Sequence, residues 1–202
     1  MTRPTLPALR TLAAAGVSAA IAAVAAAELQ AQNPMPQGFH VGAHLNGSSL
    51  QFTDQSTTES GGGLGFRLGW GFTPNFTVFL GADGASMEGG DYTLGQGDLG
   101  VRYHFASETR RGAPYVDGAF SYWLAETFEF GPKVEIGGPA ITLGGGYLHF
   151  FSSSVAFDVG LRLGFGRFDE VRSGNLTVGI DEPARTARFN LGISWFAGGS
   201  GG

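Results

Sequence analysis

The 202-residue sequence predicts an all-β fold, an eight-stranded antiparallel up-and-down transmembrane β-barrel. Three observations predict it. Beyond residue 38, apolar residues alternate with polar residues or glycine in one segment after another, as in strands with one apolar face. The connections between these segments are long and short in turn, as in a meander of hairpins. The polar positions hold mostly glycine with about one charge per segment, a composition that suits a narrow interior.

Residues 1–31 are expected to be a cleavable signal peptide. Arg3 and Arg10 precede an alanine-rich apolar stretch that ends in small residues, with cleavage after Ala27 or Ala31. A transmembrane anchor is the alternative, but a helix made so largely of alanine is weakly hydrophobic and barely long enough to span a bilayer. The sequence therefore predicts an exported chain. Its expected parts are 1–31 signal peptide, 32–37 short lead-in, 38–196 barrel and 197–202 flexible Gly/Ser tail.

Eight strands are expected, most of them about 8 to 12 residues long, which suits a tilted strand crossing the hydrocarbon layer. They are 39–46, 63–72, 76–83, 98–105, 116–122, 141–151, 157–166 and 187–195. The connections 47–62, 126–138 and 169–184 are expected to be long loops. The sixth segment is apolar on both faces, so its two sides stay unassigned.

The polar faces are expected to line the barrel interior. They carry four arginines and four aspartates, and equal numbers of guanidinium and carboxylate groups can neutralise each other through bidentate hydrogen bonds in a narrow lumen. We expect Asp158 and Arg162, for example, to form such a pair. The predicted lumen network is Arg67, Asp83, Asp98, Arg102, Asp117, Asp158, Arg162 and Arg188.

The apolar faces are expected to contact lipid. Aromatic residues gather where the strands meet the short turns, as they do at a membrane interface. A packed soluble core has no reason to sort its aromatic rings by height. The predicted lipid-facing residues are Phe66, Leu68, Trp70, Val78, Leu80, Phe157, Val159, Leu161, Leu163, Phe165, Phe189, Leu191, Ile193 and Trp195.

This pattern resembles the eight-stranded bacterial outer-membrane β-barrel family, of the OmpA-type transmembrane domain and OmpX-like kind. The resemblance covers about residues 38–196 and includes the alternating last strand from Ala187 to Trp195. It implies an outer-membrane location, short turns in the periplasm, long connections outside the cell, and contact with outer-membrane lipids and the assembly machinery. A monomer is expected.

Charge and motifs exclude several classes of function. The net charge of -5, without a basic run, lacks the electrostatic signature of a nucleic-acid binder. The string from Gly95 to Gly100 fits a dinucleotide fingerprint, but a strand pattern follows it where a helix is needed. The outer connections are acidic, so an extracellular partner is expected to be cationic or bridged by divalent ions. No cofactor is expected.

The leading functional hypothesis is a non-enzymatic barrel with a structural or surface-interaction role and a plugged lumen. A narrow channel for ions or small solutes is the first alternative, since glycine leaves room inside. A lipid-modifying enzyme is the second. For it, His40 and His44 offer a base or metal ligands, although they are better interpreted as members of the internal polar network. His149 with Ser152 offers a Ser/His pair, but both fall at the expected periplasmic end, and the sequence shows no orienting acid or oxyanion donors for them.

Overall fold

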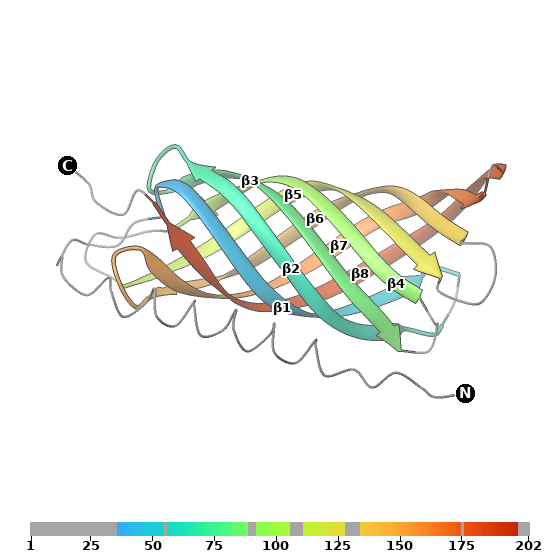
Figure 1. The fold of residues 1–202 in the computed structure, drawn as a ribbon, viewed down its shortest axis with the longest axis horizontal. Helices are drawn as coiled ribbons and strands as arrows, with labels where there is room; N and C mark the ends of the chain where they lie inside the picture. The colour runs from blue at the N-terminus through green and yellow to red at the C-terminus, as the bar shows by residue number, and fades with distance from the viewer. Residues whose placement is uncertain are drawn as a thin grey trace, which may run out of the picture.

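The eight strands close into one barrel. The computed structural model describes residues 36–54, 56–88, 92–105, 111–127, 134–174 and 176–197. All neighbouring strands are antiparallel, and β8 pairs with β1 to complete the ring, which confirms the predicted fold (Figure 1). The strands are β1 (Gly38–Phe52), β2 (Glu59–Gly71), β3 (Phe76–Glu88), β4 (Tyr92–His104), β5 (Gly112–Thr127), β6 (Val134–Phe150), β7 (Val155–Ser173) and β8 (Leu176–Phe196).

The expected signal peptide and the last five residues of the expected tail lie outside the described residues. No helix among the residues that the structure describes is long and apolar enough to span a membrane.

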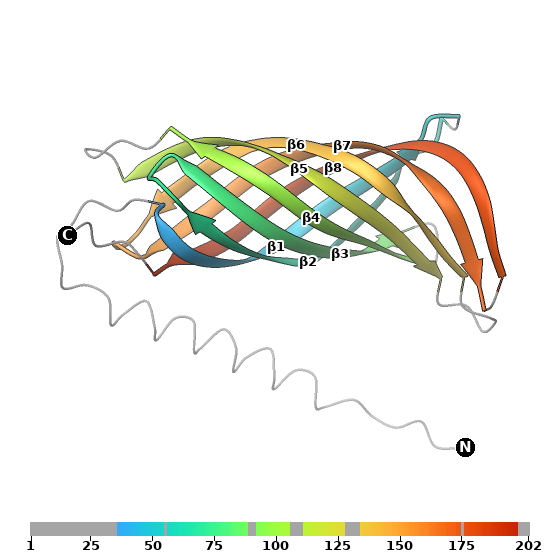
Figure 2. The same cartoon turned by 90° about the horizontal axis from the view of Figure 1, so that it is seen from above.

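The two ends of the barrel differ. The "turn end" holds the short turns between β2 and β3 and between β6 and β7, together with the start of β1 and the end of β8. The "hairpin end" is the opposite one, where β7 and β8 run on past the other strands and join at Gly174, which has a positive φ of 59° (Figures 1 and 2). Glycine is the residue that adopts this left-handed conformation without steric cost.

The strands extend farther toward the hairpin end than the sequence predicts. The expected loop 169–184 is wrong, because most of it is the continuation of β7 and β8, and β1 likewise runs on to Phe52. The alternation of side-chain burial continues as far as Leu50, Phe168 and Ala184, where the inward positions are apolar, and beyond them the residues of β7 and β8 are half-buried or exposed. A sequence pattern that requires polar residues at the inward positions therefore predicts strands that are too short.

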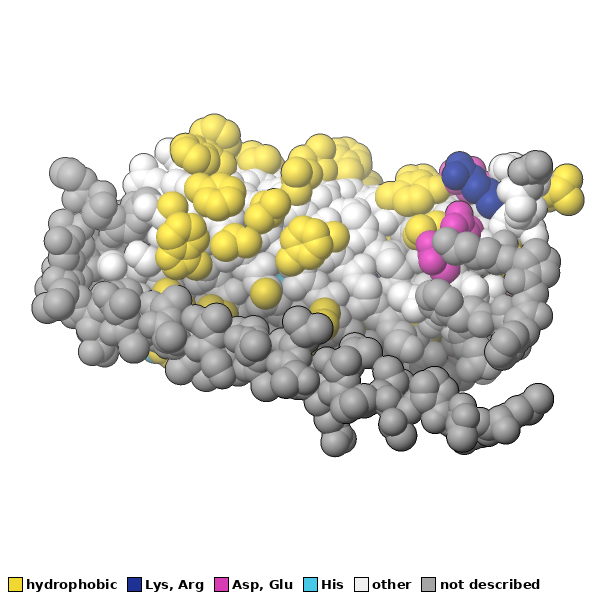
Figure 3. Space-filling model, in the orientation of Figure 1, with side chains coloured by type: hydrophobic (Ala, Val, Ile, Leu, Met, Phe, Trp, Pro, Cys, Tyr) yellow, Lys and Arg dark blue, Asp and Glu magenta, His cyan; other side chains and the backbone are white. Residues whose placement is uncertain are grey.

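Apolar side chains cover the outside of the wall. Figure 3 shows them gathered over the left and middle of the barrel, with charged side chains near the right-hand end, which is the hairpin end. The structure also assigns the sixth strand: Ile141, Leu143 and Tyr147 are exposed on the outer face, whereas Thr142 and Leu148 are buried inside.

The interior has three layers. Charged and polar side chains fill the middle, and an apolar cluster lies at each end. The cluster at the hairpin end contains Leu50, Ala85, Met87, Leu94, Trp123, Ala140, Phe168 and Ala184. The cluster at the turn end contains Ala113, Tyr115, Leu148, Phe150, Ala156 and Phe196.

Glycines inside the wall make room for large inward side chains, and one strand offers a matched test. A Cβ on Gly100 would lie 2.5 Å from the Phe79 ring and 2.6 Å from the Gly118 carbonyl oxygen, whereas nothing lies within 4 Å of a Cβ on Gly97. We expect Gly100→Val to destabilise the fold by about 1–3 kcal/mol through overpacking. Gly97→Val should change stability by less than about 0.5 kcal/mol. Urea unfolding followed by tryptophan fluorescence measures both, and equal losses would contradict this account of the wall.

Candidate functional site

The candidate site is the charged middle layer of the barrel interior. Its eight charged side chains come from six of the eight strands, and the residues are between 3 % and 7 % exposed. Alternation within each strand turns all of them to the same side of the wall. They are Arg67 on β2, Asp83 on β3, Asp98 and Arg102 on β4, Asp117 on β5, Asp158 and Arg162 on β7, and Arg188 on β8.

Asp117 lies between two arginines. Arg102 donates to its Oδ2 from both Nε, at 3.1 Å, and Nη2, at 2.8 Å. Arg162 donates from Nε to the other carboxylate oxygen, Oδ1, at 3.1 Å. Such charge-assisted hydrogen bonds are stronger than neutral ones, and both oxygens of this carboxylate are used.

The chain of ion pairs continues in both directions. On one side, the Asp158 carboxylate accepts from Arg102 Nη1 at 3.2 Å, from Arg67 Nη1 at 3.5 Å and from the Tyr115 hydroxyl at 2.7 Å. On the other side, Arg162 Nη1 donates to Asp98. The order of partners is therefore Arg67, Asp158, Arg102, Asp117, Arg162 and Asp98.

The expected pair of Asp158 with Arg162 is wrong. The two residues lie four positions apart on β7, so they share a face but are separated by roughly 13 Å along the strand. Asp158 binds Arg67 and Arg102 instead, and Arg162 binds partners on β4 and β5. Substituting Asp158 and Arg162 together would therefore leave the ion-pair partners of both residues without their counter-charges, rather than remove one self-contained pair.

A second cluster is centred on Asp83. Its Oδ1 lies 2.6 Å from His44 Nε2 and 3.3 Å from Asn46 Nδ2, and its Oδ2 lies 3.2 Å from Arg188 Nη1. Arg188 also donates from Nε to the Ser48 hydroxyl at 3.0 Å. His44 thus belongs to this polar network. In the part of the chain that the structure describes, no group of three or more His, Cys, Asp or Glu is placed to hold a metal ion.

An aromatic ring lies among the guanidinium groups. The Cζ atoms of Arg67, Arg102 and Arg162 are 5.0, 5.8 and 5.3 Å from the centroid of the Phe79 ring. Arg102 also stacks over Tyr115, with its Cζ 3.6 Å from that ring centroid. Desolvated cation–π contacts of this kind contribute to stability in addition to the ion pairs. Phe79 was not among the residues predicted for the lumen network.

Hydrogen bonds of the network cross the interior. β4 and β7, like β2 and β7, are not neighbours in the ring, yet Arg102 and Arg67 both reach Asp158. The middle of the barrel is therefore filled by side chains that connect opposite walls. The apolar clusters above and below this layer were missed by sequence reasoning, although Trp123 and Phe168 continue the inward alternation of Ser121 and Arg162 and could have been found from it.

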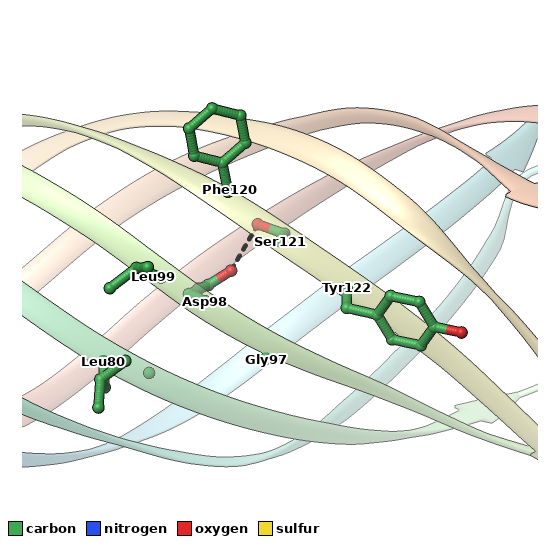
Figure 4. A pocket seen from close by; sticks show the side chains of 8 residues that line it. Leu80, Gly97, Asp98, Leu99, Phe120, Ser121 and Tyr122 are labelled. Atoms are coloured by element: carbon green, nitrogen blue, oxygen red, sulfur yellow. Dashed lines mark hydrogen bonds between the residues drawn. The ribbon is translucent and has the colours of Figure 1, made fainter.

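One stretch of wall shows both faces at close range (Figure 4). Leu80, Leu99 and Phe120 project outward around a shallow groove over β3, β4 and β5. On the inner side, the Ser121 hydroxyl donates to Asp98 Oδ1 at 2.6 Å. A single wall thickness thus separates an apolar outer surface from the charged interior.

The remaining histidine candidates have separate surroundings. His40 is buried and stacks on Phe196, with ring centroids 5.1 Å apart. His149 lies on the outer face against Tyr147, 6.5 Å between ring centroids. The Ser152 hydroxyl accepts the backbone N–H of Ser154 and Val155 within its turn, so Ser152 has a turn-forming role.

Charges at the hairpin end form local pairs. Glu170 accepts from the Tyr122 hydroxyl at 2.7 Å and pairs with Arg172 at 2.7 Å, and these two contacts lower the pKa of the Glu170 carboxyl. Arg167 pairs with Asp181 at 3.0 Å, with both side chains well exposed. Glu170 and Asp181, expected in a loop, belong to β7 and β8.

The chain has the fold of the eight-stranded outer-membrane β-barrels, with apolar residues on the outside and polar residues inside. The chain is similar to Neisserial surface protein A, NspA, with 14 % identity and a TM-score of 0.65 over 79 % of this chain and 97 % of that one. It is also similar to Ail, the attachment invasion locus protein of Yersinia pestis, with 10 % identity and a TM-score of 0.53 over 79 % of this chain and 98 % of that one. No family model and no curated protein sequence matches the chain.

The buried network predicts a large difference between two aspartates. Asp117→Ala removes the shared partner of two buried guanidinium groups and should destabilise the protein by about 3–5 kcal/mol. Asp181→Ala breaks an exposed pair with Arg167 and should cost less than about 1 kcal/mol. Unfolding titrations in urea compare the two variants, and a small loss for Asp117→Ala would show that the network does not stabilise the barrel.

Proposed function

We propose that this protein is an integral outer-membrane β-barrel with a closed interior and a non-enzymatic, structural or surface-interaction role. The observation that carries the proposal is the outer face of the wall. Side chains such as Trp70 and Leu161 are each 53 % exposed, and Phe120 is 75 % exposed. Water-soluble monomers rarely expose so large an apolar surface, whereas a closed barrel in lipid needs one and satisfies every backbone group internally.

The predicted lipid-facing set supports the same proposal. Val78, Phe157 and Val159 are half-buried and the other eleven residues are exposed. In the proposed orientation, the turn end faces the periplasm and the hairpin end faces outward. The partners are outer-membrane lipids and the assembly machinery, and the barrel acts as a monomer. The names of NspA, a surface protein, and of Ail, an attachment invasion locus protein, agree with a role at the cell surface.

The layered interior favours a plug over a channel. Ions would have to pass the apolar clusters around Trp123 at one end and Phe150 at the other, as well as the ion pairs that bridge the walls between them. Burying a charge among apolar side chains is costly, so this path opposes conduction. The acidic side chains at the hairpin end, such as Asp169 and Glu182, favour a cationic partner or one bridged by divalent ions.

Two experiments test the proposal. The protein should remain with outer-membrane fractions and require detergent for extraction. After reconstitution into planar bilayers it should show no stepwise conductance. Recovery in the soluble fraction would overturn the membrane assignment, and regular single-channel steps would overturn the plug while leaving the membrane assignment intact.

Two exposed leucines provide a test of the lipid face. Leu161 is 53 % exposed in the middle of the apolar wall, and Leu176 is 73 % exposed at the tip of the β7–β8 hairpin. In lipid bilayers Leu161→Arg should cost about 2–4 kcal/mol, as arginine does near the bilayer midplane. Leu176→Arg should cost less than about 1 kcal/mol, because the tip lies in water. Unfolding titrations from lipid vesicles measure both, and two small, equal losses would mean that the wall around Leu161 does not face lipid.

A further inference from the structure

Two arginines of the middle layer lie directly opposite each other on neighbouring strands. Arg162 of β7 and Arg188 of β8 are register partners, both side chains point inward, and each residue is 3 % exposed. The Cα atoms of opposed residues in an antiparallel pair are about 4.5–5.5 Å apart, so the two guanidinium groups leave the wall side by side. Like charges in this arrangement repel each other. The positive charge of the pair must therefore be compensated by acceptors around it.

Arg162 has one nitrogen without a hydrogen bond. It donates from Nε to Asp117 and from Nη1 to Asp98, whereas Nη2 is buried and has no hydrogen-bond partner among the described residues. Arg102 of the same layer, by contrast, donates to carboxylates from Nε, Nη1 and Nη2. The layer can therefore satisfy a guanidinium group completely, and the free Nη2 of Arg162 is a local feature.

Arg188 has two nitrogens without a hydrogen bond. Its Nε donates to the Ser48 hydroxyl at 3.0 Å. Its Nη1 lies 3.2 Å from Asp83 Oδ2 but outside hydrogen-bond geometry, and its Nη2 has no partner in the part of the chain that the structure describes. The other oxygen of Asp83 already faces His44 and Asn46, at 2.6 and 3.3 Å. Because a buried N–H without an acceptor is costly, these groups call for a further acceptor.

A free amide lies beside the two arginines. Asn190 follows Arg188 by two positions on β8, so both side chains point inward. Asn190 is 6 % exposed, and its Oδ1 is buried without a hydrogen-bond partner among the described residues. An amide whose oxygen is not held by a neighbour can rotate to present its N–H groups instead. Together with the two arginines it forms a group of buried donors that lacks an acceptor.

We propose that Arg162, Arg188 and Asn190 bind a small monatomic anion, of the size and charge of chloride, inside the barrel. An anion only accepts, so it can satisfy several N–H groups at once and offset the repulsion between the two guanidinium groups. A water molecule that accepts from the same groups must also donate two O–H groups to acceptors. A monatomic ion fits better than a phosphate or a carboxylate, because the interior of an eight-stranded barrel is filled by side chains.

The bound anion adds one negative charge to a layer in which four arginines and four aspartates balance. His44 can restore the balance, because its Nε2 lies 2.6 Å from Asp83 and a second ring proton leaves that contact in place. Asp83 in turn contacts Arg188, so the added positive charge lies one residue away from the anion. Burial of an uncompensated charge is thereby avoided.

Bromide is the probe for this site, since its anomalous X-ray scattering distinguishes it from water. Crystals of the wild-type protein, refolded in detergent micelles with sodium bromide, should show an anomalous peak within hydrogen-bond distance of Nη2 of both Arg162 and Arg188. Density at this position without an anomalous signal would identify water as the occupant and overturn the proposal. Bromide peaks confined to the outer surface would overturn it as well.

A matched pair of variants tests the site in solution. Replacing gluconate by chloride at about 100 mM and constant ionic strength should lower the unfolding constant of the wild-type protein at least about threefold, as expected when the anion concentration is about twice its dissociation constant. Arg188→Gln should lose this effect. Arg185→Gln removes the same charge from the exposed face of the same strand and should keep it. Urea titrations in micelles measure all three proteins.

The remaining outcomes also decide the matter. Equal chloride effects in the three proteins would show a general salt effect and overturn the proposal. A bromide peak in crystals without any chloride effect on the wild-type protein would mean an adventitious ion only, which overturns it too. If Arg188→Gln fails to fold, the wild-type crystals and titrations still decide.

This inference goes beyond the proposed function and does not depend on it. The site lies inside the barrel, and both measurements are made in micelles. Recovery of the protein in the soluble fraction, or single-channel steps in bilayers, would therefore refute the proposed function without removing the anion site. Loss of the anion site would likewise leave the membrane assignment intact.

Discussion

The pairing of β1 with β8 is the constraint on which the other features of this barrel depend. Closing eight strands into a ring gives every strand two neighbours and leaves an interior just wide enough for side chains to fill. Polar side chains placed there must bind one another, because little room remains for water. Apolar side chains must then cover the outside, and the result is a wall that is stable in lipid.

The ion pairs follow from that narrow space. A buried charge without a partner is costly, and each aspartate of the middle layer binds at least one arginine. The Phe79 ring lies within 6 Å of three guanidinium groups, and such cation–π contacts are attractive. Glycines opposite these long side chains leave room for them against the wall. At Gly144, for example, a Cβ would lie 2.7 Å from both Arg162 and Asp117.

Strand number, topology and closure could be predicted from alternation and connection lengths alone. Alternation also assigned residues such as Leu161 and Arg162 to opposite faces, because a strand has a period of two. Alternation could not identify which inward residues form ion pairs with each other. Asp158 binds Arg102 on β4 rather than Arg162 on its own strand, since pairing across the interior depends on the stagger between strands that are distant in sequence. The apolar clusters were missed because Trp123 and Phe168 break the expectation that inward positions are polar.

The chain of ion pairs has a consequence for how the barrel assembles. Arg67 on the second strand and Asp158 on the seventh come together only when the sheet has curled almost fully round. Arg188 on the last strand likewise reaches Asp83 on the third. In a partly formed sheet these charges lack their partners. The stabilisation from the ion pairs is therefore gained only when the ring closes. The buried ion pairs therefore favour complete closure of the ring, an effect that a barrel lined only with small neutral residues would lack.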